Sequence, residues 1–226
     1  MEEAPCGGEE LFLQGPAGNI EVSISYPAGP RGEGAVAILC HPHPLFGGSM
    51  ANKVIHTLSE TFNGMGGTVL RFNFRGVGSS EGKFDHGRGE ADDLAAIASW
   101  LRRRNPAVPL WVAGFSFGAY VALRAQPVVQ AERLLLVAPP VPLFDFRHLA
   151  PVTVPWMVIQ GGRDETVDPE AVLEWLQRQQ PRPLLRLMAD ADHFFHGRLR
   201  RLRGAVETGW HRLPSENTLA KQQQSK

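Results

Sequence analysis

The stretch WVAGFSFGAY, residues 111–120, places one serine between a β-rich apolar run and a series of small residues that suit a helix. Ser116 has a glycine two positions to either side, at Gly114 and Gly118. A sharp turn from strand to helix strains the backbone of its central residue, and side chains two positions away would collide there. The pattern G-x-S-x-G therefore predicts a nucleophile elbow that presents the Ser116 hydroxyl at a sheet edge. Taken alone, the pentapeptide also fits a glycine-flanked turn with a capping serine.

Strand-like segments recur on both sides of this stretch. Residues 10–27 predict two antiparallel strands joined by a Gly/Pro/Asn turn. Short apolar runs bounded by turn residues are typical of strands that are covered on both faces. One such run occurs at 34–42, and further strands are predicted at 68–76, 109–115, 133–139, 154–162 and 183–189.

Helix-like segments separate most of these runs. The clearest spans residues 89–106, where acidic residues near the start and arginines near the end match the helix dipole. Another is expected to begin with Ser49 as its cap and to close at Gly64. Asp168, directly before a proline, predicts the N-cap of a third, and the last helix is expected to begin near Phe194. Strands alternating with helices predict an α/β fold with a mostly parallel sheet, whose functional side chains follow the carboxyl ends of the strands.

Composition limits the class of protein. A chain of 226 residues with 43% hydrophobic composition favours one domain, and we expect it at 9–212, between a flexible N-terminus at 1–8 and a polar tail at 213–226. Equal numbers of basic and acidic residues, 23 each, argue against a nucleic-acid partner, and no apolar run reaches the length of a membrane span. The first residues are acidic and show no signal peptide, and the only two cysteines, Cys6 and Cys40, give no disulfide framework. Both observations indicate a cytoplasmic protein. Nothing in the pattern predicts an oligomeric state.

Two polar residues complete the chemistry that Ser116 needs. A serine hydroxyl becomes an effective nucleophile when a base takes its proton and a carboxylate orients that base. In the fold that the elbow predicts, these partners follow in the order Ser, Asp, His. Asp164 lies just beyond the run at 154–162, and His193 lies just beyond the next run. Singly, they also fit a turn residue and a surface-loop histidine; together, their order and positions favour a catalytic triad.

Other acidic and histidine residues lie close by. Asp190 and Asp192 are too near His193 in sequence to orient its ring from behind. His196 is the rival base, but it is expected to lie inside the last helix and so to neighbour the site rather than act in it.

An acyl-transfer site also requires amide donors for the developing oxyanion. The amide of Phe117, directly after the nucleophile, is one candidate. The second is expected in the loop CHPHPLFGG at 40–48, where the prolines carry no N–H, which leaves His43, Leu45 and Phe46. We prefer His43, which occupies the place of the residue after the His-Gly pair usual in such loops.

The same loop invites a metal interpretation, because His41 and His43 lie two residues apart. Two histidines spaced between prolines make a poor chelate, and no cysteine or glutamate cluster accompanies them. We therefore expect no metal site.

Three segments together resemble the α/β-hydrolase superfamily, and more closely its small bacterial hydrolases. They are HPHPLFGG at 41–48, RFNFRGVGSSEG at 71–82 and LWVAGFSFGAY at 110–120, and the resemblance spans about residues 10–200. It implies an eight-stranded α/β-hydrolase fold with Ser116 as nucleophile, Asp164 as acid and His193 as base. It also implies a structural role for Arg75 in the R-G-x-G-x-S loop. Pro42 departs from the glycine that many members have, which bears on the path of the oxyanion loop.

These observations predict a serine hydrolase that cleaves small ester-type acyl bonds through an acyl-enzyme and needs no cofactor. The partner is then a small-molecule acyl substrate. A thioesterase or a peptidase/amidase would use the same site, and a non-catalytic binding protein on a hydrolase scaffold is the alternative from another class. An intact Ser, Asp and His set argues against the binding protein.

The segment 139–153 bears on substrate access. It is too short for a multi-helix cap, and its four prolines disfavour a helical lid, so we expect a minimal lid or none. Packing of the loop onto the sheet is the alternative role of its apolar side chains, but we expect them to line the acyl pocket together with two side chains from the oxyanion loop. The predicted pocket residues are Leu45, Phe46, Leu143, Phe144 and Phe146.

Overall fold

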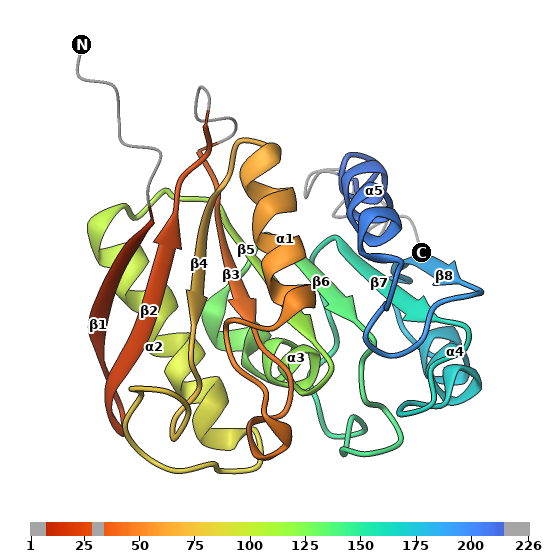
Figure 1. Ribbon diagram of the computed structural model, residues 1–226, viewed down its shortest axis with the longest axis horizontal. Helices are drawn as coiled ribbons and strands as arrows, with labels where there is room; N and C mark the ends of the chain where they lie inside the picture. The colour runs from red at the N-terminus through yellow and green to blue at the C-terminus, as the bar shows by residue number, and fades with distance from the viewer. Residues whose placement is uncertain (1–7, 29–33, 215–226) are drawn as a thin grey trace.

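The fold is described by a computed structural model for residues 8–28 and 34–214. An eight-stranded sheet with strand order β1-β2-β4-β3-β5-β6-β7-β8 forms its centre (Figure 1). The β1–β2 and β2–β4 pairs are antiparallel and the remaining pairs are parallel. The predicted α/β-hydrolase fold with a mostly parallel sheet is thereby confirmed. The strands are β1 (Glu9–Gly15), β2 (Gly18–Ser25), β3 (Val36–Cys40), β4 (Thr68–Phe72), β5 (Leu110–Phe115), β6 (Arg133–Val137), β7 (Trp156–Gly161) and β8 (Leu184–Met188).

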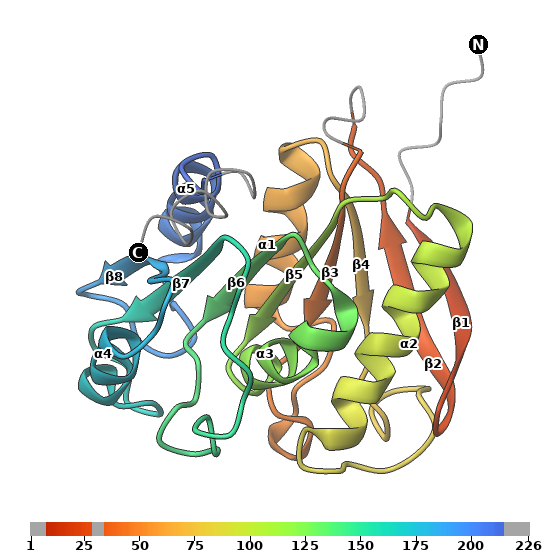
Figure 2. The same ribbon diagram turned by 180° about the vertical axis from the view of Figure 1, so that it is seen from behind.

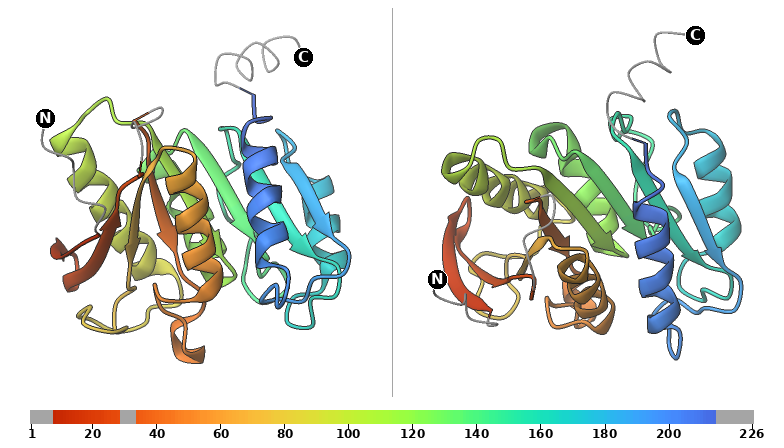
Figure 3. Two further views of the ribbon diagram at one scale, coloured as in Figure 1. Left: turned by 45° about the horizontal axis from the view of Figure 1, so that its top comes forward. Right: turned by 90° about the horizontal axis from the view of Figure 1, so that it is seen from above.

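Helices cover both faces of this sheet, as the view from above shows (Figure 3). On one face lie α1 (Lys53–Gly64) and α5 (Leu199–Trp210). The opposite face carries the other three helices, seen from behind in Figure 2. They are α2 (Arg88–Arg104), α3 (Phe117–Val129) and α4 (Pro169–Gln177). Each face has its own apolar core, so the central strands are buried on both sides.

Two helix starts differ from the sequence prediction. The N-cap of α1 is Asn52 and not Ser49, because the Asn52 side chain accepts hydrogen bonds from the amides of the first turn. The last helix begins at Leu199 and not near Phe194. Phe195 and Gly197 have φ values of 56° and 63°, which a right-handed helix does not accommodate.

The predicted cap of α4 is confirmed. Asp168 accepts a hydrogen bond from Glu170 N at 3.0 Å, and the following proline occupies the first helical position.

Most of the two predicted terminal segments, and Cys6, lie outside the described residues. Of the predicted tail, Leu213 is described and is buried in the core on the α1 and α5 face. No helix in the described part of the chain is long and apolar enough to cross a membrane.

Candidate active site

Ser116 lies at the turn between β5 and α3, as the pattern predicts. Its φ and ψ of 55° and −121° are strained for a residue with a side chain, and its N–H is held by Val137 O at 2.8 Å. A Cβ on Gly114 would overlap Gly118 O, and a Cβ on Gly118 would overlap Cys40 O. The two glycines are therefore required by the close approach of the turn to itself and to the end of β3.

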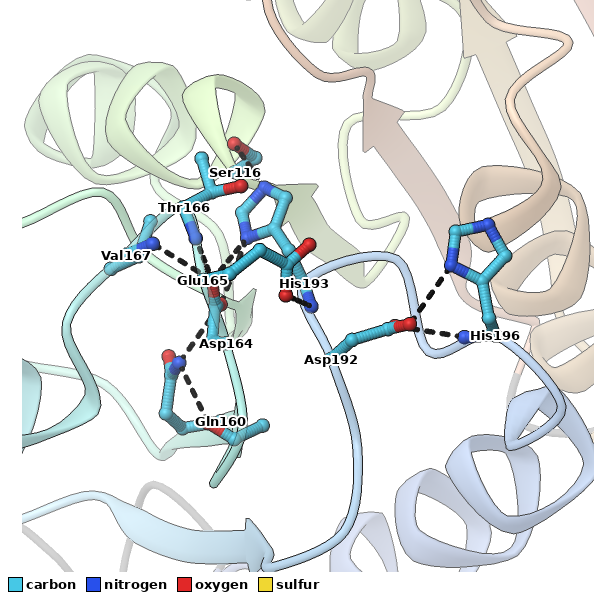
Figure 4. Close-up of polar contacts among 10 residues, drawn as sticks. Ser116, Gln160, Asp164, Glu165, Thr166, Val167, Asp192, His193 and His196 are labelled. Atoms are coloured by element: carbon cyan, nitrogen blue, oxygen red, sulfur yellow. Dashed lines mark hydrogen bonds and ion pairs between the residues drawn. The ribbon is translucent and has the colours of Figure 1, made fainter.

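The structure brings His193 and Ser116 together although 77 residues separate them. His193 Nε2 lies 3.1 Å from Ser116 Oγ (Figure 4). Its Nδ1 lies 2.8 Å from Asp164 Oδ2, and a carboxylate oxygen accepts hydrogen bonds. Nδ1 of the neutral ring thus carries the proton, and Nε2 is left to accept a hydrogen bond from the hydroxyl of Ser116. The three residues are buried, with 9%, 7% and 2% of Ser116, Asp164 and His193 exposed.

Asp164 is held by several N–H donors besides His193. Its Oδ1 accepts from Thr166 N at 2.9 Å and from Val167 N at 2.7 Å. Asp164 is therefore a turn residue, which was the alternative interpretation from sequence, and in the same conformation it also faces His193. These bonds compensate a carboxylate that is almost fully withdrawn from water.

One polar contact of this site escaped the sequence analysis. Gln160, in β7, is fully buried and donates from Nε2 to Asp164 Oδ2 at 3.0 Å. The available signal was a single amide side chain inside the apolar run WMVIQGG.

The rival histidine is placed elsewhere. His196 lies in the turn before α5, where its Nδ1 is 2.9 Å from Asp192 Oδ2 and its side chain is 73% exposed. Figure 4 shows this pair apart from Ser116. The structure therefore joins His193, and not His196, to Ser116.

The loop after β3 leaves one of its three candidate amides free. Leu45 N donates to His43 Nδ1 at 3.2 Å, and Phe46 N donates to His43 O at 3.1 Å. Among the described residues, the His43 amide has no hydrogen-bond acceptor, and neither has Phe117 N at the start of α3. Both amides are thus available to an added ligand.

His41 and His43 have different surroundings. His41 is fully buried; its Nδ1 donates to Pro42 O at 2.7 Å and its Nε2 accepts from Phe74 N at 3.0 Å, so both ring nitrogens are occupied. The ring of His43 packs against those of Phe46, Phe84 and Phe117, with centroids 4.8, 4.9 and 4.9 Å away. Burial, followed by the nearby His86, lowers the pKa of His43.

The predicted pocket residues differ in how far their side chains are exposed. Leu45, Phe46 and Leu143 are exposed, by 68%, 85% and 58%. Phe144 is half-buried; its ring stacks on Tyr120 at 4.8 Å and lies 5.4 Å from Phe117.

Phe146 is only 6% exposed and packs against Trp175 of α4. This contact corresponds to the alternative role, in which the side chain packs the loop onto the body of the protein. A groove of about 430 Å³ between this loop and α4 is lined by Leu143, Phe144 and Phe146, and Ser116 is not among its lining residues.

Arg75 has the structural role that the resemblance implied. Its guanidinium binds the buried carboxylate of Asp93 in α2 through two hydrogen bonds of 2.9 and 2.7 Å. This pair ties the loop after β4 to the helix that follows it.

Known proteins are similar to this chain in sequence and in architecture. Residues 35–210 match the family described as "Alpha/beta hydrolase domain". A lidless a/b serine hydrolase of Xanthomonas campestris, XC6422, is 45% identical, with a TM-score of 0.88 over 95% of this chain and 99% of that one. An alpha-beta serine hydrolase homologue of Coxiella burnetii is 40% identical, with a TM-score of 0.85 over 88% and 96% of the two chains. Protein RP471 of Rickettsia prowazekii is 37% identical over 196 residues, which is 82% of each chain.

Proposed function

The chain belongs to the alpha/beta hydrolase domain family, and on that premise we propose that it hydrolyses small ester-type acyl compounds through an acyl-enzyme on Ser116. The observation that carries the proposal is the continuous chain of contacts from Ser116 Oγ to His193 Nε2 and from His193 Nδ1 to Asp164. A serine joined in this way to a base and an orienting carboxylate is the arrangement that activates a hydroxyl for acyl transfer.

The reaction starts with proton transfer from Ser116 Oγ to His193 Nε2 as the oxygen attacks the substrate carbonyl carbon. The resulting imidazolium keeps its Nδ1–H on Asp164, whose negative charge stabilises it. His193 then gives the Nε2 proton to the leaving alcohol, and the acyl group remains on Ser116. A water molecule repeats the sequence, which releases the carboxylic acid and returns the proton to Ser116.

The amides of Phe117 and His43 serve as donors to the oxyanion. In support, both are free in the described structure, whereas the Leu45 and Phe46 amides already have acceptors on His43. The ring contact between His43 and Phe117, at 4.9 Å, and the close approach of Gly118 to the end of β3 bring the two segments next to each other. Oxyanion donors of this kind contribute about 10²–10³-fold each to turnover.

A fluorophosphonate probe tests the nucleophile. We expect it to label the protein at Ser116, and we expect Ser116→Ala to abolish labelling and to lower kcat for a short-chain activated ester by several orders of magnitude while the protein remains folded. Mass spectrometry locates the adduct, and circular dichroism verifies the fold. Adduct formation elsewhere, or labelling of the alanine variant, contradicts the proposal.

Two histidine variants provide the matched comparison. His193→Ala should remove almost all activity, and combining it with Ser116→Ala should add little, because triad members act as one unit. His196→Ala changes an exposed histidine of the same loop and should retain most of the activity. The opposite ranking would assign the base to His196.

A further inference from the structure

Gln160 is an unusual residue for its place in the sheet. It lies in β7, a strand in which all six residues are buried, and is itself 0% exposed. An amide side chain in such surroundings is unfavourable unless hydrogen bonds replace those it made to water. We therefore expect the Gln160 amide to make hydrogen bonds inside the protein.

The contacts of the amide determine its orientation. Its nitrogen lies 3.0 Å from Asp164 Oδ2 and 3.2 Å from Gly161 O, and both of these atoms accept hydrogen bonds. The NH₂ group must therefore face them, and the opposite assignment of the amide would set oxygen against oxygen. Gln160 Oε1 is then left buried, with no partner among the described residues. An unpaired buried oxygen costs free energy, so the interaction with Asp164 and Gly161 is what holds the side chain in this orientation.

The oxygen that Gln160 contacts is the one nearest to the base. Asp164 Oδ2 lies 2.8 Å from His193 Nδ1 and Oδ1 lies 3.0 Å from it, and Oδ1 is also held by the two backbone amides of its turn. Apart from His193, Gln160 is the one described side chain that donates to this carboxylate. It thereby fixes the rotation of the carboxyl group from the Oδ2 side and shares the charge that Asp164 presents to the imidazolium.

We propose that Gln160 is a positioning residue of the triad, whose N–H holds Asp164 Oδ2 in the direction from which it accepts the His193 Nδ1 proton. This inference rests on the proposed hydrolase function. It assigns to β7 a side chain that neither touches substrate nor takes part in proton transfer, and that acts through Asp164.

Gln160→Met tests the proposal, because methionine keeps the length and burial of the side chain and removes the N–H. We expect kcat to fall about 10- to 100-fold with KM nearly unchanged, as when a hydrogen bond that orients a functional side chain is lost. The matched control is Gln126→Met, the same change at a buried glutamine in α3 that has no contact with the triad, and its kcat should match wild type. A wild-type kcat in Gln160→Met overturns the proposal.

Gln160→Glu gives a readout that a packing role would not move. In its protonated form, the introduced carboxyl can donate to Asp164 as the amide does; in its ionised form, it repels Asp164 and donates nothing. We expect the ratio of variant to wild-type kcat to decrease as the pH rises. A ratio that is independent of pH, in a variant that remains folded, contradicts the proposal.

The His193 Nδ1–H resonance in proton NMR separates this inference from the proposed function. Wild-type protein that neither reacts with the fluorophosphonate nor cleaves esters refutes the hydrolase proposal. The resonance still reports on the Asp164–His193 hydrogen bond in that case. It should shift in Gln160→Met and stay unchanged in Gln126→Met, and an unshifted resonance refutes the role of Gln160.

Discussion

His41 shows how burial beside the site fixes the protonation state of a side chain. Pro42 O only accepts and Phe74 N only donates, so Nδ1 carries the proton and Nε2 presents its lone pair. A second proton on Nε2 would face the N–H of Phe74. Burial accordingly lowers the pKa of His41 from 6.5 to about 4.

This depressed pKa predicts a loss of stability in acid. Between about pH 6.5 and about pH 4 the unfolded chain binds a proton that the folded protein does not, so the free energy of unfolding decreases as the pH falls. The full difference corresponds to about 3 kcal/mol, from about 1.4 kcal/mol for each unit between the two pKa values. Urea unfolding at pH 7 and at pH 4.5 measures most of this difference, because the remainder is lost only below the folded pKa of about 4. His41→Asn should be less stable at pH 7 and should lose less on acidification; an equal loss in both proteins would exclude His41 as the cause.

Individual residues were predictable from sequence to different degrees. Ser116, Asp164 and His193 follow the ends of β5, β7 and β8, and that position in a parallel sheet is where side chains converge. Gln160 is the second-to-last residue of β7 and so lies inside the strand, before the loop that carries Asp164. Its contact with Asp164 was missed, because that contact depends on how the Asp164 turn folds back. The choice among the loop amides was likewise open, since it depends on which of them His43 engages.

The loop between β3 and α1 is organised by one of its own side chains. His43 Nδ1 accepts from Leu45 N at 3.2 Å, and its carbonyl accepts from Phe46 N at 3.1 Å and from Gly48 N at 3.0 Å. Prolines at 42 and 44 restrict the backbone on either side. His43 therefore caps the short turn η1 (Pro44–Phe46) and leaves its own amide free.

This capping contact predicts a specific order of activity among variants. His43→Ala keeps the backbone amide but removes the acceptor for Leu45 N, so we expect kcat to fall about tenfold, less than the loss of an oxyanion donor itself. His43→Asn should recover part of that loss, because an asparagine oxygen at a cap accepts from the amide two residues later. Steady-state kinetics on one short-chain ester compare the three proteins. Equal losses in both variants would show that the ring's packing, and not the cap, is what matters.

The helices and strands themselves were largely evident from hydrophobic runs and turn residues, and the errors fell at helix starts. Ser49 and Asn52 are both good caps, and only the folded turn shows that Asn52 faces the free amides of α1. The start of α5 depends on Phe195, a fully buried residue with a positive φ of 56°. Local sequence favours no such conformation for phenylalanine, so packing against the core determines it.

At the scale of the whole molecule, the described residues form no lid over the carboxyl edge of the sheet. Between β6 and β7, residues 138–155 form turns and no helix. Phe146 and Val152 are buried, with 6% and 3% exposed, and Phe146 lies 5.2 Å from the ring of Trp175 in α4. The segment is thus attached to the body of the protein at two points. We therefore expect this loop to form a fixed rim and not a mobile lid.

A fixed rim predicts ordinary saturation kinetics with no activation at a lipid–water interface. Interfacial activation requires a lid that an interface displaces, and here the buried Phe146 and Val152 anchor the segment between β6 and β7 to the body of the protein. We expect the rate on a short-chain ester to rise smoothly with concentration and to level off through its solubility limit. A lidded lipase assayed in parallel should instead show a sharp increase at that limit. Such an increase in this protein, or a preference for esters of long acyl chains, would show that segment 139–153 moves.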